Sequence, residues 1–314
     1  MEILIFGAGA VGLGMGSALL AADCGVKLVA RPASVEALRR EGLVRTGFFG
    51  SHRAAPESFS AASSMAELPQ EPVDVALVAT KSFDSEAAAR ALAQQPALVG
   101  PETRVVLFQN GWGNAERFLP HFPEERVWNA RVITGFRRIA PNQVDITVHA
   151  EPVHVGSLFG CNPAPLSALC SAISRGGIPC EITAHIAEDL WAKLLYNGLL
   201  NPLGALFGVP YGALAESPHA RHVMAALARE IFAVMRAAGY TTHWETPEAY
   251  LESLYGELLP PTAAHESSTL QDLRAGRPTE IDALLGAVVT LGGASAVSTP
   301  VAATLYRMIR FLEN

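Results

Sequence analysis

The residues with the clearest potential for chemistry lie in the second half of the chain. Lys193 and Asn197 are four residues apart in the segment Asp189–Asn197, whose pattern predicts a helix. Their side chains therefore share one helix face. Because this helix is apolar on nearly all sides, we expect Lys193 to point into a cleft rather than into bulk water. A lysine ammonium in a cleft can stabilise a developing oxyanion and act as a general acid.

Other polar residues in this half of the chain fit structural roles as well as chemical ones. Asn201 directly precedes Pro202, and Asn at the N-cap followed by Pro at N1 is a standard helix start. Ser267 could likewise cap a helix, and Thr279 with Asp282 fits the capping-box pattern. Taken alone, each of these residues is more typical of helix capping than of catalysis.

A glycine motif near the start of the chain predicts a nucleotide-binding loop. The apolar run Ile3–Phe6 reads as a buried strand, the sequence GAGAVG follows at 7–12, and a helical pattern comes next. In such a loop Gly7 permits the tight turn, Gly9 lets a pyrophosphate approach the backbone, and Gly12 lets the helix pack closely on its strand. The helix N-terminus then offers N–H groups to the phosphates. A secretion signal is disfavoured, because no cationic region opens the chain and glycines interrupt the apolar stretch.

The end of the second predicted strand indicates which dinucleotide the loop would bind. In an NAD site, a carboxylate about 20 residues after the glycines usually binds the ribose 2′-hydroxyl. Residues 27–32 contain no carboxylate, and Arg31 lies where a 2′-phosphate would be. A guanidinium can bind a phosphate through paired hydrogen bonds, whereas a carboxylate would repel it. A lone arginine here is more commonly a solvated surface residue, but the missing acid and Arg31 together favour NADP(H) and disfavour a flavin dinucleotide.

Two further polar residues follow predicted strands. Lys81 ends the run Val73–Thr80, and Asn110 ends the run Arg104–Gln109. The carboxyl ends of strands in an open parallel sheet face the ligand, so Lys81 is well placed near a cofactor phosphate or ribose. Asn110 is followed by glycine, and Asn-Gly is also a common turn dipeptide. For Asn110 a simple turn and a functional role are about equally supported.

Composition predicts a globular protein with two domains. The chain has 314 residues, of which 50% are hydrophobic and 17% charged, with a net charge of −7, and this argues against nucleic-acid binding. The four cysteines show neither a CxxC pair nor metal-site spacing, so we expect reduced thiols, a cytoplasmic location and no metal. His219 and His222 are expected on a surface helix rather than at a metal. No segment is long and apolar enough to predict a membrane span.

The order of predicted elements favours an α/β fold, with a Rossmann-type doubly wound sheet domain at 1–182 and an all-helical domain at 183–314. Strands and helices alternate at first, as in a parallel sheet covered on both faces. Short strands then suggest an antiparallel extension, and the second half is helical, with the active site expected in a cleft between the domains. The expected strands are Ile3–Phe6, Val26–Ala30, Val73–Thr80, Arg104–Gln109, Val127–Thr134, Gln143–His149 and Val153–Leu158. The expected helices are 11–23, Ser34–Glu41, Ser85–Gln94, Pro165–Arg175, Ile186–Leu200, Pro202–Leu206, Pro218–Ala238, Pro247–Leu258, Ser267–Ala275, Ile281–Leu291 and Pro300–Leu312.

Motifs spread over nearly the whole chain resemble those of the ketopantoate reductase (2-dehydropantoate 2-reductase) family. The Lys, Ser-Ser and Thr-Glu-Ile-Asp elements together are far more specific than the glycine loop. The matching pieces are GAGAVG at 7–12, QNG at 109–111, LWAKL at 190–194 with Asn197 and NPL at 201–203, SSTLQD at 267–272 and PTEID at 278–282.

The resemblance implies roles for individual residues. It implies a catalytic pair, Lys193 and its partner acid Glu280, and substrate-binding or site-ordering roles for Asn110, Asn197, Asn201 and Ser268. It implies an NADP(H) site formed by Gly7, Ala8, Gly9, Ala10, Val11, Gly12, Arg31, Lys81, Asn110 and Glu280. Two departures stand out: His265 replaces an expected Asn near the substrate carboxylate, and Ala302 replaces an Asn in the last helix.

The implied reaction is the NADPH-dependent reduction of ketopantoate to pantoate in pantothenate biosynthesis, with Lys193 as general acid. His265 keeps open another 2-oxo acid as the substrate. A non-catalytic NADP(H)-sensing protein would not need both Lys193 and Glu280, so their joint presence weighs against it. The implied partner is a small 2-oxo acid, and we expect neither a nucleic acid nor a membrane as a partner. The long apolar helices of the second domain would suit a homodimer contact.

Overall fold

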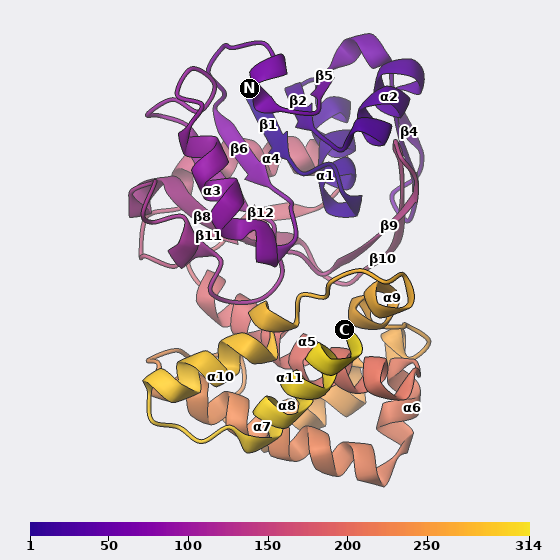
Figure 1. Cartoon of the computed structure of the whole chain (residues 1–314), viewed down its shortest axis with the longest axis vertical. Helices are drawn as coiled ribbons and strands as arrows, with labels where there is room; N and C mark the ends of the chain where they lie inside the picture. Colours follow the sequence, from indigo (N-terminus) through magenta and orange to yellow (C-terminus); the bar gives the residue numbers. More distant parts are fainter. The chain divides into compact units, whose positions relative to one another are not determined.

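A computed structural model describes residues 1–314. The chain forms two compact units. The first unit holds Met1–Gln109 and Asn114–Ile186, and the second holds Asn110–Gly113 and Ala187–Asn314. The first is built on strands and the second on helices (Figure 1). The predicted combination of a Rossmann-type sheet domain with an all-helical domain is confirmed.

An eight-stranded sheet forms the centre of the first unit, in the order β12-β11-β8-β7-β6-β1-β2-β5. All neighbouring strands run parallel except β11 and β8, which are antiparallel. The strands are β1 (Glu2–Phe6), β2 (Gly25–Val29), β5 (Ser60–Ala62), β6 (Val75–Val78), β7 (Arg104–Leu107), β8 (Val127–Arg131), β11 (Val153–Gly156) and β12 (Cys180–Ile182).

The central strand β1 explains why this sheet is covered on both faces. Ile3, Leu4 and Ile5 are completely buried. Because side chains alternate across a strand, Ile3 and Ile5 join one hydrophobic core, and Leu4 joins the core on the opposite face. A strand buried on both sides needs a continuous apolar run rather than alternation, which is why the sequence signal at Ile3–Phe6 was clear.

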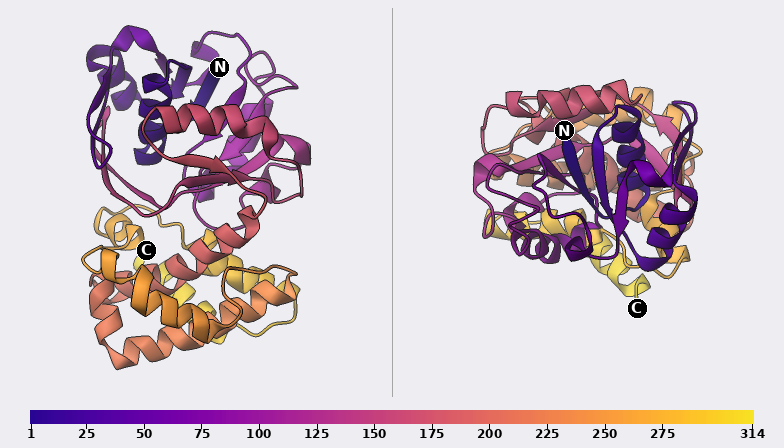
Figure 2. Two further views of the ribbon diagram at one scale, coloured as in Figure 1. Left: turned by 180° about the vertical axis from the view of Figure 1, so that it is seen from behind. Right: turned by 90° about the horizontal axis from the view of Figure 1, so that it is seen from above.

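Helices cover both faces of the sheet. Side chains of α1 (Ala10–Ala21), α2 (Pro32–Glu41) and α4 (Ser167–Arg175) enter the core that contains Ile3 and Ile5, whereas α3 (Ser85–Ala93) packs on the other face. Figure 2 shows α4 along one side of the strands. The prediction of a doubly wound sheet is therefore confirmed.

The predicted antiparallel extension is partly wrong. Val127–Arg131 forms β8, which runs parallel to β7 and continues the main sheet. The long connection between β7 and β8 gives the chain the crossover that a parallel pair needs. Antiparallel pairing in this sheet begins only at β11.

A second sheet of four strands, in the order β4-β3-β10-β9, was only partly foreseen. It packs through buried side chains of β3, β4 and β10 into the core that contains α1. Its strands are β3 (Leu43–Gly47), β4 (His52–Ala54), β9 (Thr134–Ala140) and β10 (Gln143–His149). Of these, only Gln143–His149 was predicted. Three of the four strands are short or rich in polar residues, so local periodicity gave little signal.

The second unit consists of helices linked by short turns. They are α5 (Ile186–Phe207), α6 (Tyr211–Glu216), α7 (Pro218–Ala237), α8 (Pro247–Ser253), α9 (Ser268–Arg274), α10 (Leu285–Ala294) and α11 (Pro300–Leu312). A π-helical turn, Leu254–Leu258, extends α8, and short 3₁₀ turns lie at Pro260–Thr262 and Ile281–Ala283. No helix in either unit combines the length and the apolarity that crossing a bilayer requires.

The predicted break before Pro202 is wrong, because α5 continues through this proline to Phe207. A proline inside a helix costs about 3 kcal/mol relative to alanine. Leu199, Leu200 and Leu203 on either side of it are buried, and burying one leucine side chain is worth about 1.5–3 kcal/mol. Tertiary packing therefore outweighs the local penalty, and Asn201 lies inside a helix rather than at its N-cap.

Candidate active site

The ammonium of Lys193 is held by an amide from a distant part of the sequence. Lys193 Nζ donates a hydrogen bond to Asn110 Oδ1 at 2.6 Å, and Asn110 Nδ2 donates to Glu280 Oε2 at 3.2 Å. Glu280 is buried, whereas Lys193 and Asn110 are half-buried. One asparagine thus links a lysine to a carboxylate. Because an amide is a neutral acceptor, it orients the ammonium without cancelling its charge.

The backbone around Gly111 explains how Asn110 reaches this position. Gly111 has φ of +86°, and a Cβ added there would lie 2.3 Å from the carbonyl oxygen of Ala283. Only glycine accepts both the left-handed backbone and this close approach. The next residue, Trp112, donates its N–H to the same carbonyl oxygen at 2.8 Å. Asn110-Gly111 is therefore both a turn and the support of a polar contact, so the two interpretations of this dipeptide are compatible.

Two aromatic rings pack on Trp112, which belongs to the same loop. The ring of Trp112 lies 4.7 Å from that of Trp191 on α5 and 4.7 Å from that of Tyr240. Trp112 and Trp191 are buried. Aromatic pairs at such separations contribute about 0.5–1.5 kcal/mol beyond burial. The loop is thereby fixed to α5 two residues before Lys193.

The helix α5 carries three of the predicted site residues on one face. Asn197 and Asn201 follow Lys193 at intervals of four residues, so the three side chains span about 12 Å along the helix. Asn201 is buried, and its Oδ1 accepts a hydrogen bond from the Tyr211 hydroxyl at 2.6 Å. Burial, and then the nearby Tyr196, raise the pKa of Tyr211, so its hydroxyl remains a donor.

The start of α9 lies beside the far end of this face. Ser267 is buried and caps α9, as predicted, by accepting a hydrogen bond from the N–H of Leu270 at 3.0 Å. Its hydroxyl also lies 3.3 Å from the carbonyl oxygen of Asn201 and donates to it. Ser268, the first residue of α9, is exposed. The packing of Ser267 therefore brings Ser268 close to the Asn201 end of α5.

His265 lies next to the same region. Its ring is 5.3 Å from the ring of Tyr211, and its carbonyl oxygen accepts the N–H of Tyr211 at 3.1 Å. Burial lowers the pKa of His265 below its ordinary value, although the neighbouring Glu266 acts in the opposite direction. The lowered pKa favours the neutral imidazole over the charged form.

The predicted capping box at Thr279 and Asp282 is wrong. The N–H of Thr279 is bound by Glu313 Oε1 at 2.7 Å, so it is not available to Asp282, whose Oδ1 accepts from the Tyr306 hydroxyl instead. The hydroxyl of Thr279 accepts the N–H of Ile281. Glu280 consequently occupies the N-cap position of a 3₁₀ turn, Ile281–Ala283, the turn that also receives Trp112.

The glycine loop of the first unit has the shape that a pyrophosphate requires. Gly7 has φ of +106°, and a Cβ there would lie 2.8 Å from the N–H nitrogen of Thr80. A Cβ on Gly12 would lie 2.1 Å from the carbonyl oxygen of Gly7, whereas the nearest atom to one on Gly9 would be 3.9 Å away. The helix α1 begins directly afterwards, at Ala10. Crowded glycines thus flank an open one at a helix N-terminus, which fits a bound dinucleotide phosphate.

The basic residues predicted for the cofactor follow strands of the main sheet. Arg31 is exposed and lies at the N-cap of α2, two residues after β2. No carboxylate forms an ion pair with it. Lys81 follows β6, and its carbonyl oxygen accepts a hydrogen bond from Gln109 Nε2 at 3.2 Å. Gln109 also binds Thr80 and Ser85, so it ties together the loops after β6 and β7, a role we did not predict. The sequence signals were its place next to Asn110 and its membership of the QNG motif at 109–111.

The hydroxyl of Tyr211 offers a test of the Asn201 environment. Tyr211→Phe leaves Asn201 Oδ1 without its donor and is expected to lower the free energy of unfolding by about 1–3 kcal/mol. Tyr250→Phe is the matched control, since Tyr250 is completely buried and its hydroxyl has no hydrogen-bond partner. That change should be neutral or stabilising. Urea denaturation of both variants makes the comparison, and equal effects would contradict the assigned hydrogen bond.

Comparisons with known proteins agree with this architecture along the whole chain. Residues 3–159 match the family model described as Ketopantoate reductase PanE/ApbA, and residues 185–313 match its C-terminal model. A 2-dehydropantoate 2-reductase of Aquifex aeolicus (strain VF5) is 34% identical over 100% of this chain and 97% of its own. A 2-dehydropantoate 2-reductase of Halobacterium salinarum is 29% identical over 100% and 99%.

A solved structure gives the same picture. The crystal structure of a PanE/ApbA family ketopantoate reductase from Ralstonia eutropha JMP134 superimposes with a TM-score of 0.86 at 28% identity, covering 100% of this chain and 98% of that one. The two family models together match most of the chain, and the Aquifex aeolicus relative also covers residues 160–184, which lie between the two matched ranges. The chain therefore belongs to the ketopantoate reductase family.

Proposed function

We propose that this protein is an NADPH-dependent 2-dehydropantoate 2-reductase, which reduces ketopantoate to pantoate in pantothenate biosynthesis. The observation that carries the proposal is the hydrogen bond between Lys193 and Asn110, which places an oriented ammonium on the face of α5 that also carries Asn197 and Asn201. The names of full-length relatives support the same activity. We assign NADP(H) binding to residues 1–182 and substrate binding to residues 183–314.

The proposed binding of a dinucleotide rests on the open glycine loop, and the preference for NADP(H) rests on Arg31. The N-terminus of α1 would bind the pyrophosphate, with Gly9 giving the backbone room for it. Arg31, without an acidic partner, and Lys81 would bind the adenosine phosphate or its ribose. A carboxylate that would repel a 2′-phosphate is missing from the end of β2.

The residues of the second unit suit reduction of a 2-oxo acid. Bound NADPH supplies a hydride to the carbonyl carbon. Lys193 would stabilise the negative charge on the carbonyl oxygen and donate a proton to it. Asn110 would orient Lys193, and Glu280 would hold Asn110 or a hydroxyl of the substrate.

The remaining predicted residues suit the carboxylate end of the substrate. Tyr211 occupies Oδ1 of Asn201, which leaves the amide Nδ2, a donor, for a carboxylate. Asn197 and Ser268 can supply further donors from neighbouring positions on α5 and α9. Neutral donors are sufficient to bind the substrate carboxylate, because hydrogen bonds to a charged acceptor are stronger than those between neutral groups.

The role of Lys193 is tested by removing its charge while keeping most of its unbranched side chain. Lys193→Met should lower kcat at least about 100-fold, because the developing oxyanion loses both its counter-charge and its proton donor. Binding of NADPH, followed by fluorescence titration, should be retained. Near-normal turnover in this variant would remove Lys193 from the acid role, and a folded variant that no longer binds NADPH would place Lys193 in the cofactor site instead.

The substrate is tested by following NADPH oxidation against a panel of 2-oxo acids that includes ketopantoate. We expect the highest kcat/KM with ketopantoate. A higher value with another branched or hydroxylated 2-oxo acid would identify a different reductase, for which the departure at His265 is the structural support. Tight NADPH binding without turnover of any panel member would indicate the non-catalytic sensing protein.

A further inference from the structure

A second arginine lies at the start of α2, close to Arg31, and comes from the other sheet of the first unit. Arg138 on β9 donates from Nη2 to the hydroxyl of Ser34 at 2.6 Å, and the N–H of Ser34 donates to the carbonyl oxygen of Arg31 at 2.8 Å. Ser34 therefore contacts both arginines. Two residues that are distant in sequence therefore lie at one end of α2, Arg31 as its N-cap residue and Arg138 through its guanidinium group.

The strand β9 directs Arg138 toward the helices. Phe136 lies on the same face of the strand as Arg138, because side chains alternate along it. The ring of Phe136 packs so closely on Gly14 of α1 that a Cβ at Gly14 would lie 2.3 Å from it. The next residue, Arg137, faces the other way and forms an ion pair with Asp145 at 2.8 Å. Register thus gives two adjacent arginines different surroundings.

Neither arginine at the start of α2 is neutralised. Besides Ser34, Arg138 binds only the carbonyl oxygens of Ala140 and Pro141, at 3.2 and 3.1 Å. No carboxylate forms an ion pair with Arg138 or Arg31. Burial, and then the positive charge of Arg31, lower the pKa of Arg138. The positive charge of Arg31 therefore acts on the guanidinium group of Arg138, and neither charge is balanced by an ion pair.

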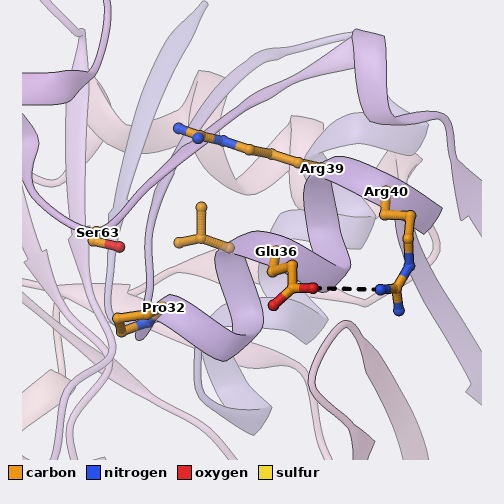
Figure 3. Close-up of a pocket in the computed structure, with 6 residues that line it drawn as sticks. Pro32, Glu36, Arg39, Arg40 and Ser63 are labelled. Carbon is orange, nitrogen blue, oxygen red and sulfur yellow. Dashed lines mark hydrogen bonds and ion pairs between the residues drawn. The ribbon is translucent and has the colours of Figure 1, made fainter.

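The rest of α2 shows the opposite arrangement. A pocket of about 470 Å³ lies along this helix and is lined by Pro32, Val35, Glu36, Arg39, Arg40 and Ser63. Figure 3 shows the side chains that line it. Arg40 forms ion pairs with Glu36 and Glu41, and Arg39 donates to the carbonyl oxygen of Ala61. The pocket carries its own carboxylate, so it is a poor site for an anion. Uncompensated positive charge is concentrated at Arg31 and Arg138.

We propose that Arg138 is a second ligand of the 2′-phosphate of NADPH, beside Arg31, and that the pair sets the preference for NADPH over NADH. A phosphate dianion bound to both guanidinium groups would relieve their repulsion and form charge-assisted hydrogen bonds. NADH lacks this phosphate and leaves the repulsion in place. The inference rests on the proposed function, because it concerns the cofactor assigned there.

The test compares Arg138→Ala with Arg137→Ala, which removes the same charge from the neighbouring residue. Arg138→Ala should lower the ratio of kcat/KM for NADPH to kcat/KM for NADH about tenfold or more. The reason is that hydrogen bonds to charged groups are strong. Arg137→Ala should leave the ratio of the two values within about twofold of the wild type. Arg138→Gln, which can still donate to Ser34 without a charge, should behave like Arg138→Ala.

A second measurement does not depend on turnover. Calorimetric titration with adenosine 2′,5′-bisphosphate and with AMP should show that both Arg138 variants weaken binding of the bisphosphate about tenfold more than binding of AMP. A purely structural role would weaken both ligands, or both cofactors, to the same extent and would overturn the inference. A wild-type NADPH preference that Arg138→Gln retains would also overturn it while leaving the proposed function intact. A wild-type protein without any preference for NADPH would instead remove the proposed cofactor, and the inference with it.

Discussion

The hydrogen bond between the Asn110 amide and the Lys193 ammonium is the interaction on which the helical site depends. A lysine side chain has four flexible carbons and, left in water, samples many positions. The amide fixes the ammonium at 2.6 Å and stays uncharged. The carboxylate of Glu280 is joined to the far end of the same amide. In the proposed reaction, the ammonium oriented in this way would stabilise a developing oxyanion.

This contact exists because four residues leave the sheet unit and pack with the helices. The strand β7 ends at Leu107, and the segment Asn110–Gly113 is grouped with the helical unit. The segment contacts that unit through a backbone hydrogen bond to the carbonyl oxygen of Ala283 and through aromatic packing on the ring of Trp191. Asn110 is in this way placed in one polar network with Lys193 and Glu280, which lie more than 80 positions away in the sequence. The sheet keeps its own core.

Local sequence patterns predicted the elements whose signals are strong over a few residues. The glycine loop, the buried strands and the last helix, Pro300–Leu312, follow from periodicity and turn chemistry. The shared face of Lys193 and Asn197 follows from helix geometry alone. Patterns failed where distant contacts decide the outcome. Pro202 remains helical because its neighbours are buried.

Two site features could not be predicted for the same reason. The position of Asn110 depends on the docking of Gly111 against Ala283, and no local pattern reports which backbone a loop will meet. Arg138 belongs to β9, a strand that was not predicted, although its partner strand β10 was. The hydrogen bond between Arg138 and Ser34 could therefore not be predicted from the sequence. The resemblance to a known family identified candidate residues, whereas the structure identifies the residues that hold them.

The most direct measurement of the central claim is a double-mutant cycle on hydride transfer, with single-turnover rates for wild type, Asn110→Ala, Lys193→Met and the combined variant. If Asn110 acts by orienting Lys193, its removal matters only while the lysine is present. The combined variant should then be no slower than Lys193→Met alone, within about twofold, because residues that act as a unit are strongly non-additive. Rate losses that multiply in the combined variant would show that the two residues act independently and would contradict the account.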